Sequence, residues 1–218
     1  MTLKIKNHTR IPILIILLLG ILSVRSVNAA HLIIPMDDAQ KNHLKAYGIA
    51  YWVLGKDVSI EWLLNYRGGS FAFPYHSVFE NECKTRGISF EMIADAQYMA
   101  IKQQIANPEA NMDAIKMEKA PKIAIYSPKS KQPWDDAVTM VLTYAEIPYD
   151  VVFDDEVMQN KLAEYDWLHL HHEDFTGQFG KFWASHRHEA WYQKEVRDAY
   201  DMAAKWGYGK PSELKLAV

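Results

Sequence analysis

Short apolar runs rich in β-branched residues alternate along this chain with longer stretches of helical periodicity. Such alternation is typical of α/β folds in which helices connect the strands of a parallel sheet. The predicted strands are Leu32–Pro35, Val58–Leu64, Ile88–Ile93, Lys122–Tyr126, Asp150–Phe153 and Trp167–His171. We therefore expect an α/β protein with a three-layer, Rossmann- or flavodoxin-like parallel sheet.

The segments between the predicted strands carry apolar residues at the spacing of one helix face. The predicted stripes are Leu44, Tyr47, Tyr51 and Leu54; then Trp134, Ala137, Val138, Val141, Leu142 and Ala145; and finally Tyr192, Val196, Ala199, Ala203 and Trp206. Each stripe predicts an amphipathic helix that buries this face. A further helix is predicted over Tyr75–Arg86.

The order strand, helix, strand, helix, strand occurs twice along the chain. It predicts two tandem βαβ units, residues 30–109 and 122–218, joined by a linker at 110–121 whose boundaries are marked by Asn107-Pro108 and Ala120-Pro121. One continuous sheet crossed by an extra helix fits the pattern equally well. A helix that begins at Pro211 reaches only about two turns, so we expect the second unit to be truncated and the natural protein to continue.

The first 29 residues have the three parts of a secretory signal. Lys4, Lys6 and Arg10 precede the apolar run Ile11 to Val24, and Val27-Asn28-Ala29 resembles a cleavage site. The run is shorter than the roughly 20 residues of a membrane-spanning helix. We therefore predict a signal peptide over residues 1–29, cleavage after Ala29, a periplasmic or extracellular protein, and no stable membrane insertion after cleavage.

Charge and cysteine content exclude two further classes of protein. The leader holds four of the 24 lysines and arginines and none of the 27 acids, which leaves 20 basic and 27 acidic residues, a net charge of −7 with neutral histidine. An acidic chain without a basic run is a poor partner for nucleic acid. Cys83 is the single cysteine, so no intramolecular disulfide can form. We expect Cys83 to be a partly buried structural thiol.

Polar residues follow most of the predicted strands, where ligands bind in open parallel sheets. These loops contain Met36-Asp37-Asp38, Tyr66-Arg67-Gly68-Gly69-Ser70, Ala94-Asp95, Ser127-Pro128-Lys129, Asp154-Asp155 and His171-His172-Glu173-Asp174. The last loop is the strongest candidate, and we predict that His171, His172, Glu173 and Asp174 contact a small polar molecule.

Histidine spacing at the end of the last strand raises the question of a metal. His169 and His171 share one strand face and could chelate an ion, with His186 and His188 as further ligands. The local pattern departs from the His-x-His-x-Asp-His of metallo-β-lactamase-like hydrolases. Structural histidines or a polar ligand site explain it better, and we expect neither a metal nor a cofactor.

The two glycines after Arg67 leave two interpretations open. Gly68 and Gly69 would let the backbone approach an anion while Arg67 supplied a bidentate clamp, or the segment is simply a tight turn. We include Arg67, Gly68 and Gly69 among the candidate ligand-binding residues. Asp37-Asp38 is interpreted as a helix N-cap, with sugar or cation binding as the alternative.

Several stretches resemble a family of secreted bacterial proteins labelled asparagine synthetase B. They are His31-Leu-Ile-Ile-Pro-Met-Asp-Asp, Asn42-His-Leu-Lys-Ala-Tyr-Gly-Ile-Ala-Tyr-Trp, Trp62-Leu-Leu-Asn-Tyr-Arg-Gly-Gly-Ser-Phe and Leu168-His-Leu-His-His-Glu-Asp-Phe. The label implies ATP-dependent transfer of glutamine ammonia to aspartate. That chemistry uses a cysteine after the initiating methionine, where this chain has Thr2, and a Ser-Gly-Gly-x-Asp-Ser loop, which Arg67-Gly-Gly-Ser does not match.

The second half resembles the start of a class I glutamine-amidotransferase-like domain, including trehalose-utilisation relatives. The resemblance is carried by Lys122-Ile-Ala-Ile-Tyr, Tyr149-Asp-Val-Val-Phe and Tyr165-Asp-Trp-Leu-His-Leu. The resemblance to the labelled family implies a Met-Cys-Ser-Ala nucleophile elbow beyond Val218. We therefore expect an exported hydrolase or binder of amide- or glycan-related small molecules; the labelled synthetase and a non-catalytic periplasmic ligand-binding protein are the alternatives.

Overall fold

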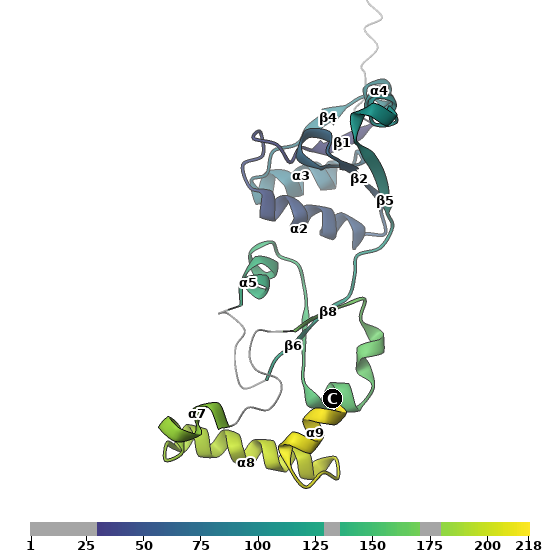
Figure 1. Ribbon diagram of the computed structural model, residues 1–218. Helices are drawn as coiled ribbons and strands as arrows, with labels where there is room; N and C mark the ends of the chain where they lie inside the picture. The colour runs from purple at the N-terminus through teal and green to yellow at the C-terminus, as the bar shows by residue number, and fades with distance from the viewer. Residues whose placement is uncertain (1–29, 129–135, 171–179) are drawn as a thin grey trace, which may run out of the picture.

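The computed structural model describes residues 30–128, 136–170 and 180–218, and the side chains from residue 183 onward in the last range. Its strands form two sheets, of order β4-β1-β3-β2-β5 and β7-β6-β8 (Figure 1). The strands are β1 (His31–Ile34), β2 (Ile60–Leu64), β3 (Ser70–Pro74), β4 (Glu91–Ile93), β5 (Asp113–Met117), β6 (Ile123–Tyr126), β7 (Asp150–Val152) and β8 (Trp167–Leu170). The α/β class is confirmed, and the strands are divided between two sheets rather than joined in one.

The first sheet is antiparallel in all of its pairings, so the parallel, Rossmann-like sheet predicted for residues 30–109 is wrong. The cause is β3, which the prediction missed. It follows β2 directly through the 3₁₀ turn η1 (Tyr66–Gly68) and pairs back on it, with Trp62 opposite Phe71. A hairpin therefore stands where we expected a helical crossover, and β3 runs antiparallel to both of its neighbours, β2 and β1.

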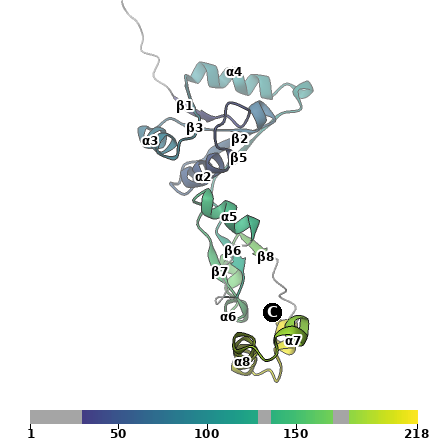
Figure 2. The same cartoon turned by 90° about the vertical axis from the view of Figure 1, so that its left-hand side faces the viewer.

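Helices cover both faces of this sheet, as Figure 2 shows. Helices α2 (His43–Leu54) and α3 (Ser77–Arg86) lie on one face, and α4 (Asp95–Ile105) lies on the other. Strand β1 alternates accordingly: Leu32 and Ile34 join the cluster with α2 and α3, whereas Ile33 joins the cluster with Ile105 of α4. All three side chains are at most 1% exposed, so β1 is an interior strand.

Helix α2 buries only part of the predicted stripe, of which Leu54 is 6% exposed. Its buried side includes Ile49 and Val53, whereas Leu44 and Tyr47 of the predicted stripe are 39% and 45% exposed. The helix is capped by Asn42, whose side chain accepts a hydrogen bond from the backbone N–H of Lys45. The N-cap interpretation of Asp37-Asp38 is therefore wrong.

The second sheet is parallel, as predicted: β6 pairs with β7 on one side and with β8 on the other. Helix α5 (Ala137–Tyr144) packs through Leu142 against Ile123 and Ile125. The remaining helical elements are α6 (Asp154–Met158), α7 (Gly180–His186), α8 (Ala190–Lys205), α9 (Pro211–Ala217), and the 3₁₀ turns η2 (Pro108–Ala110) and η3 (Lys161–Glu164). None of the helices in the described ranges is both long and apolar enough to cross a bilayer.

The region predicted as a linker contains a strand. Strand β5 lies within residues 110–121 and pairs with β2 over its whole length, from Leu64 opposite Asp113 to Ile60 opposite Met117. The prediction of a linker over all of 110–121 is therefore wrong. The strand was missed because an exposed, charged edge strand has little apolar periodicity. Only residues 118–122 connect the two sheets.

Helix α2 also contacts the second half of the chain. The Tyr51 hydroxyl donates to the carbonyl of Pro121 at 2.7 Å, and its ring packs on the cluster of Ile123, Ile125 and Leu142. The side-chain amide of Asn42 donates to the hydroxyl of Tyr144 at 2.6 Å. One face of α2 thus belongs to the first core and another to the junction with α5.

Candidate functional site

The carboxyl edge of the second sheet is the first candidate site. The chain leaves the central strand β6 for β7 on one side and then crosses to β8 on the other. In open α/β sheets this reversal of direction separates the loops after the two strands, and ligands bind there. The residues at the ends of β6 and β8 are therefore the ones to examine for polar groups.

His169 and Asp136 form a partly buried hydrogen-bonded pair beside this edge. The Nε2 atom of His169 lies 3.1 Å from each carboxylate oxygen of Asp136, and the side chains are 19% and 7% exposed. Asp136 is also the N-cap of α5, because it accepts from the backbone N–H groups of Val138 at 2.8 Å and Thr139 at 3.1 Å. The helix cap and the histidine thus fix the same carboxylate.

These bonds determine the charge of Asp136. Burial by itself raises the pKa of the carboxyl, but the hydrogen bonds from His169, Thr139 and Val138 outweigh it and lower the pKa to about 2. The carboxylate is therefore ionised at neutral pH and holds the proton of His169 on Nε2. The other ring nitrogen, Nδ1, is then an acceptor in the neutral imidazole.

Ser127 lies directly beyond β6 on the same face of the sheet as His169. Its backbone N–H donates to the carbonyl of Val152 at 3.0 Å, which continues the strand by one residue. Ile125, two residues earlier, is the register partner of His169, so alternation places Ser127 on that face. The Ser127 residue is 1% exposed, and its Oγ has no hydrogen-bond partner among the described residues. A buried hydroxyl without a partner costs about 1–3 kcal/mol, which a bound polar group could recover.

Tyr126, Asp154 and Lys215 form a second buried polar cluster at the ends of β6 and β7. The Tyr126 hydroxyl donates to Asp154 at 2.5 Å, and the Lys215 ammonium lies 2.8 Å from the Tyr126 oxygen and pairs with Asp154. Burial raises the pKa of Tyr126, and the bond to Asp154 raises it further. Burial also lowers the pKa of Lys215, although Asp154 opposes this shift. Through this cluster, α9 is attached to the edge of the sheet.

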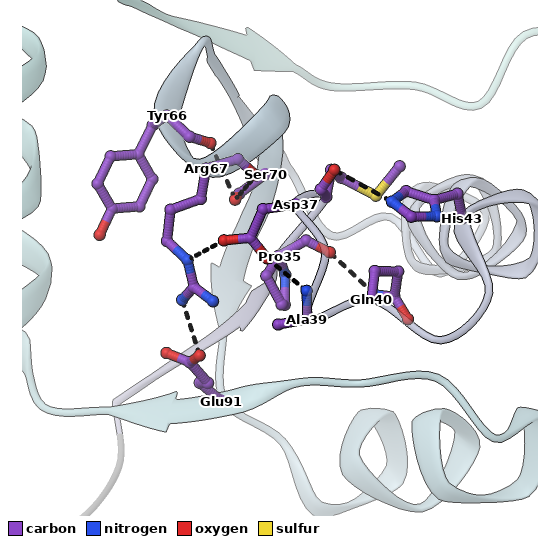
Figure 3. A network of polar contacts seen from close by, with 10 residues as sticks. Pro35, Asp37, Ala39, Gln40, His43, Tyr66, Arg67, Ser70 and Glu91 are labelled. Carbon is purple, nitrogen blue, oxygen red and sulfur yellow. Dashed lines mark hydrogen bonds and ion pairs between the residues drawn. The ribbon is translucent and has the colours of Figure 1, made fainter.

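The second candidate site surrounds Arg67 and is drawn in Figure 3. The guanidinium forms ion pairs with Asp37, at 2.8 Å from Nε, and with Glu91, at 2.7 Å from Nη1. The hydrogen bond from Arg67 lowers the pKa of Asp37, and both carboxylates raise the pKa of Arg67. The clamp that we predicted for an anion from outside is thus engaged by two carboxylates of the chain itself.

The glycines beside Arg67 serve the same internal contact. Gly68 has φ +78°, and a Cβ added there would overlap the backbone carbonyl of Met36. The backbone N–H of Met36 donates to the carbonyl of Arg67 at 3.0 Å, and the Met36 carbonyl contacts His43 Nε2 at 3.1 Å. Gly69, at φ +94°, continues the left-handed turn. Of the two interpretations of Arg67-Gly68-Gly69, the structure has the tight turn, which docks on the loop after β1.

The other predicted residues fall into three groups. His171, His172, Glu173 and Asp174 lie outside the described residues, as do Lys129 and Trp134. Cys83 is fully buried rather than partly buried as expected, and burial raises the pKa of its thiol to about 12. His186 packs beside Trp191, with ring centroids 5.2 Å apart.

Among the described residues, no group of three or more histidines, cysteines and acids could hold a metal ion. The metal interpretation would have His169 chelate an ion together with His171. In the structure, Nε2 of His169 contacts Asp136.

Asp136 and Lys215 were missed as site residues. An N-cap signal could have identified Asp136, because an aspartate precedes the apolar stripe of α5. No local pattern identifies Lys215, whose partner Asp154 is 61 residues away.

Comparisons of the chain with protein-family models, with curated proteins and with solved structures find no match.

Proposed function

We propose that the protein is exported and that its second half binds a small polar molecule at the carboxyl edge of the β7-β6-β8 sheet. The strand order supports a flavodoxin- or Rossmann-like unit, as the resemblance to class I amidotransferase-like domains implies. The observation that carries the proposal is the Ser127 hydroxyl, buried without a partner in the described chain at the end of the central strand.

The described charges around the carboxyl edge of the second sheet indicate a neutral ligand. Lys215 is paired with Asp154, Lys205 is paired with Asp155 at 2.7 Å, and Asp136 remains ionised. These cations are already neutralised by carboxylates, so a phosphate or carboxylate ligand would meet little positive charge. An amide or a sugar hydroxyl group suits a serine hydroxyl and an imidazole acceptor, and we propose amide- or glycan-related molecules as the ligand class.

The role of His169 in this site is to bind rather than to attack. Asp136 orients the ring and holds its proton on Nε2, so that Nδ1 can accept a hydrogen bond from an amide N–H or a hydroxyl group. The resemblance places the nucleophile of any hydrolysis beyond Val218. Binding is therefore the activity that we propose for the residues described above.

Calorimetric titration tests this proposal with defined probes. The mature chain, residues 30–218, is titrated with L-glutamine, L-asparagine, N-acetylglucosamine and trehalose, and with inorganic phosphate for comparison. We expect at least one neutral probe to bind more tightly than phosphate. Ser127→Ala removes one buried hydrogen bond and should weaken that binding by about fivefold to tenfold.

Ser77→Ala is the matched control, because it makes the same chemical change at the exposed start of α3. Its affinity for the bound probe should equal that of the unchanged protein. Equal weakening by both variants, phosphate as the preferred probe, or no binding of any neutral probe would each overturn the proposed site.

A further inference from the structure

The first residue after the predicted cleavage point is already part of the folded sheet. The backbone N–H of Ala30 donates to the carbonyl of Ile93 at 2.9 Å, and the Ala30 carbonyl accepts from the N–H of Tyr75 at 2.9 Å. These two bonds extend the ladders of β1 toward the N-terminus by one residue. The bond between Ala29 and Ala30 is therefore immediately adjacent to an interior strand.

The next residues are held just as firmly. His31 is the register partner of Pro74 on one side and Ile93 on the other. Its ring stacks on Tyr98 with centroids 3.9 Å apart and an angle of 16° between the planes, and Nδ1 lies 3.3 Å from Asp95. Leu32, which follows, has no exposed surface. Pulling Ala30 and His31 away from the sheet would break pairings with both β3 and β4.

We propose that the bond between Ala29 and Ala30 can be cleaved only while β1 is unfolded, so that the chain crosses the membrane and is processed before its first sheet forms. A peptidase must bind the backbone on both sides of the bond that it hydrolyses. In the folded protein the polar backbone groups of Ala30 are occupied, and their release requires opening of the sheet that contains the first core. This inference rests on the proposed export.

The chemistry of cleavage is compatible with the later docking of β1. Hydrolysis consumes one water, leaves a carboxylate on Ala29 and releases the amine of Ala30. The protonated amine still has hydrogens to donate to the Ile93 carbonyl, so the mature chain retains that contact after folding.

A refolding competition with the full-length precursor tests the inference. The precursor is unfolded in urea and diluted into a bacterial leader peptidase in detergent, either at once or after tryptophan fluorescence shows that refolding is complete. Product is identified by mass spectrometry as a chain that begins at Ala30. We expect efficient cleavage on immediate dilution and a rate lower by about tenfold or more after refolding, because the site then becomes accessible only through unfolding.

An insertion variant provides the matched control. A flexible spacer of about eight Gly and Ser residues, placed between Ala30 and His31, keeps the residues around the cleaved bond and moves them away from β1. The refolded variant should be cleaved as fast as its unfolded form. Resistance of the refolded variant, or equal cleavage of refolded and unfolded wild-type precursor, would overturn the inference and leave the export proposal intact. Failure of the peptidase to cut even the unfolded precursor would instead overturn both.

Discussion

Gly48 of α2 faces the carbonyl of Ala145 so closely that a Cβ added at Gly48 would overlap the carbonyl oxygen. Ala145 is the C-cap of α5, and the guanidinium of Arg86 also donates to its carbonyl, at 3.4 Å. Helix α2 thus approaches the end of α5 at a position where only glycine fits. The two halves of the chain meet through backbone as well as side chains.

Gly48→Ala should therefore destabilise the protein, even though alanine favours helix formation. The added methyl group forces α2 and α5 apart, and we expect a loss of about 2 kcal/mol or more in the free energy of unfolding, measured in urea. Gly55→Ala is the control, since the nearest atom to its added Cβ would be 3.4 Å away and its φ is −68°. Its stability should change by less than about 1 kcal/mol. Similar losses in both variants would contradict the close approach.

Gly68→Ala should cost more than the same change at Gly87. Both residues have positive φ, +78° and +70°, so both variants incur the strain of a left-handed alanine, about 1–2 kcal/mol. At Gly68 the methyl group also meets the Met36 backbone, whereas nothing lies within 4 Å at Gly87. We expect an additional loss of about 1–3 kcal/mol for Gly68→Ala in urea unfolding. Equal losses would show that the turn does not pack tightly on the loop after β1.

Asp136 should contribute to stability in a defined range of pH. Its pKa is about 2 in the folded protein, below the ordinary value of 3.8, so its ionised form stabilises the fold above about pH 4. That contribution is lost as pH falls from about 4 toward 2. Asp136→Asn should accordingly be less stable than the wild type above pH 4, and the difference should shrink as pH approaches 2.

Urea unfolding from about pH 2 to pH 6 measures this dependence. The control is Asp57→Asn, the same substitution at an exposed residue whose φ of +59° asparagine also tolerates. Its stability curve should run parallel to that of the wild type. A constant offset of Asp136→Asn across the whole range would mean that the hydrogen bonds to Asp136 do not lower the pKa of its carboxyl.

Lys215→Met should leave the charge of Asp154 without its buried cation. The two side chains are 9% and 4% exposed, and loss of one partner of such a pair costs about 3–5 kcal/mol. The double variant Lys215→Met with Asp154→Asn removes the stranded charge and should regain part of this loss in urea unfolding. Lys194→Met, which breaks the exposed pair with Asp198, should cost no more than about 0.5 kcal/mol. Strictly additive effects of the two buried substitutions would exclude a coupled pair.

Cys83 should be unreactive in the folded protein. It has no exposed surface, and burial raises the pKa of its thiol to about 12, so little thiolate is present at about pH 8. A disulfide reagent such as Ellman's reagent should release colour only after urea is added. Stoichiometric reaction without denaturant would show that α3 opens readily.

Local pattern predicted much of the secondary structure and little of the strand pairing. Strands β1, β6, β7 and β8 lie within one residue of their predicted bounds, because each is a short apolar run with clear ends. Strand β3 was missed although Gly68-Gly69 before Phe71 is a hairpin signal, since a strand buried on both faces shows no alternation. Whether β2 turned back or crossed over then decided between an antiparallel and a parallel sheet.

The sequence by itself determined the α/β class, strands β6, β7 and β8, helices α5, α8 and α9, and polar residues such as Ser127 and Asp154 at the strand ends. Only the tertiary structure decided that Arg67 pairs with Asp37 and Glu91, that Lys215 reaches Asp154, and that Gly48 meets Ala145. The physical reason is range: periodicity and capping depend on neighbours within a few residues, whereas ion pairs and close approaches join segments that only packing brings together.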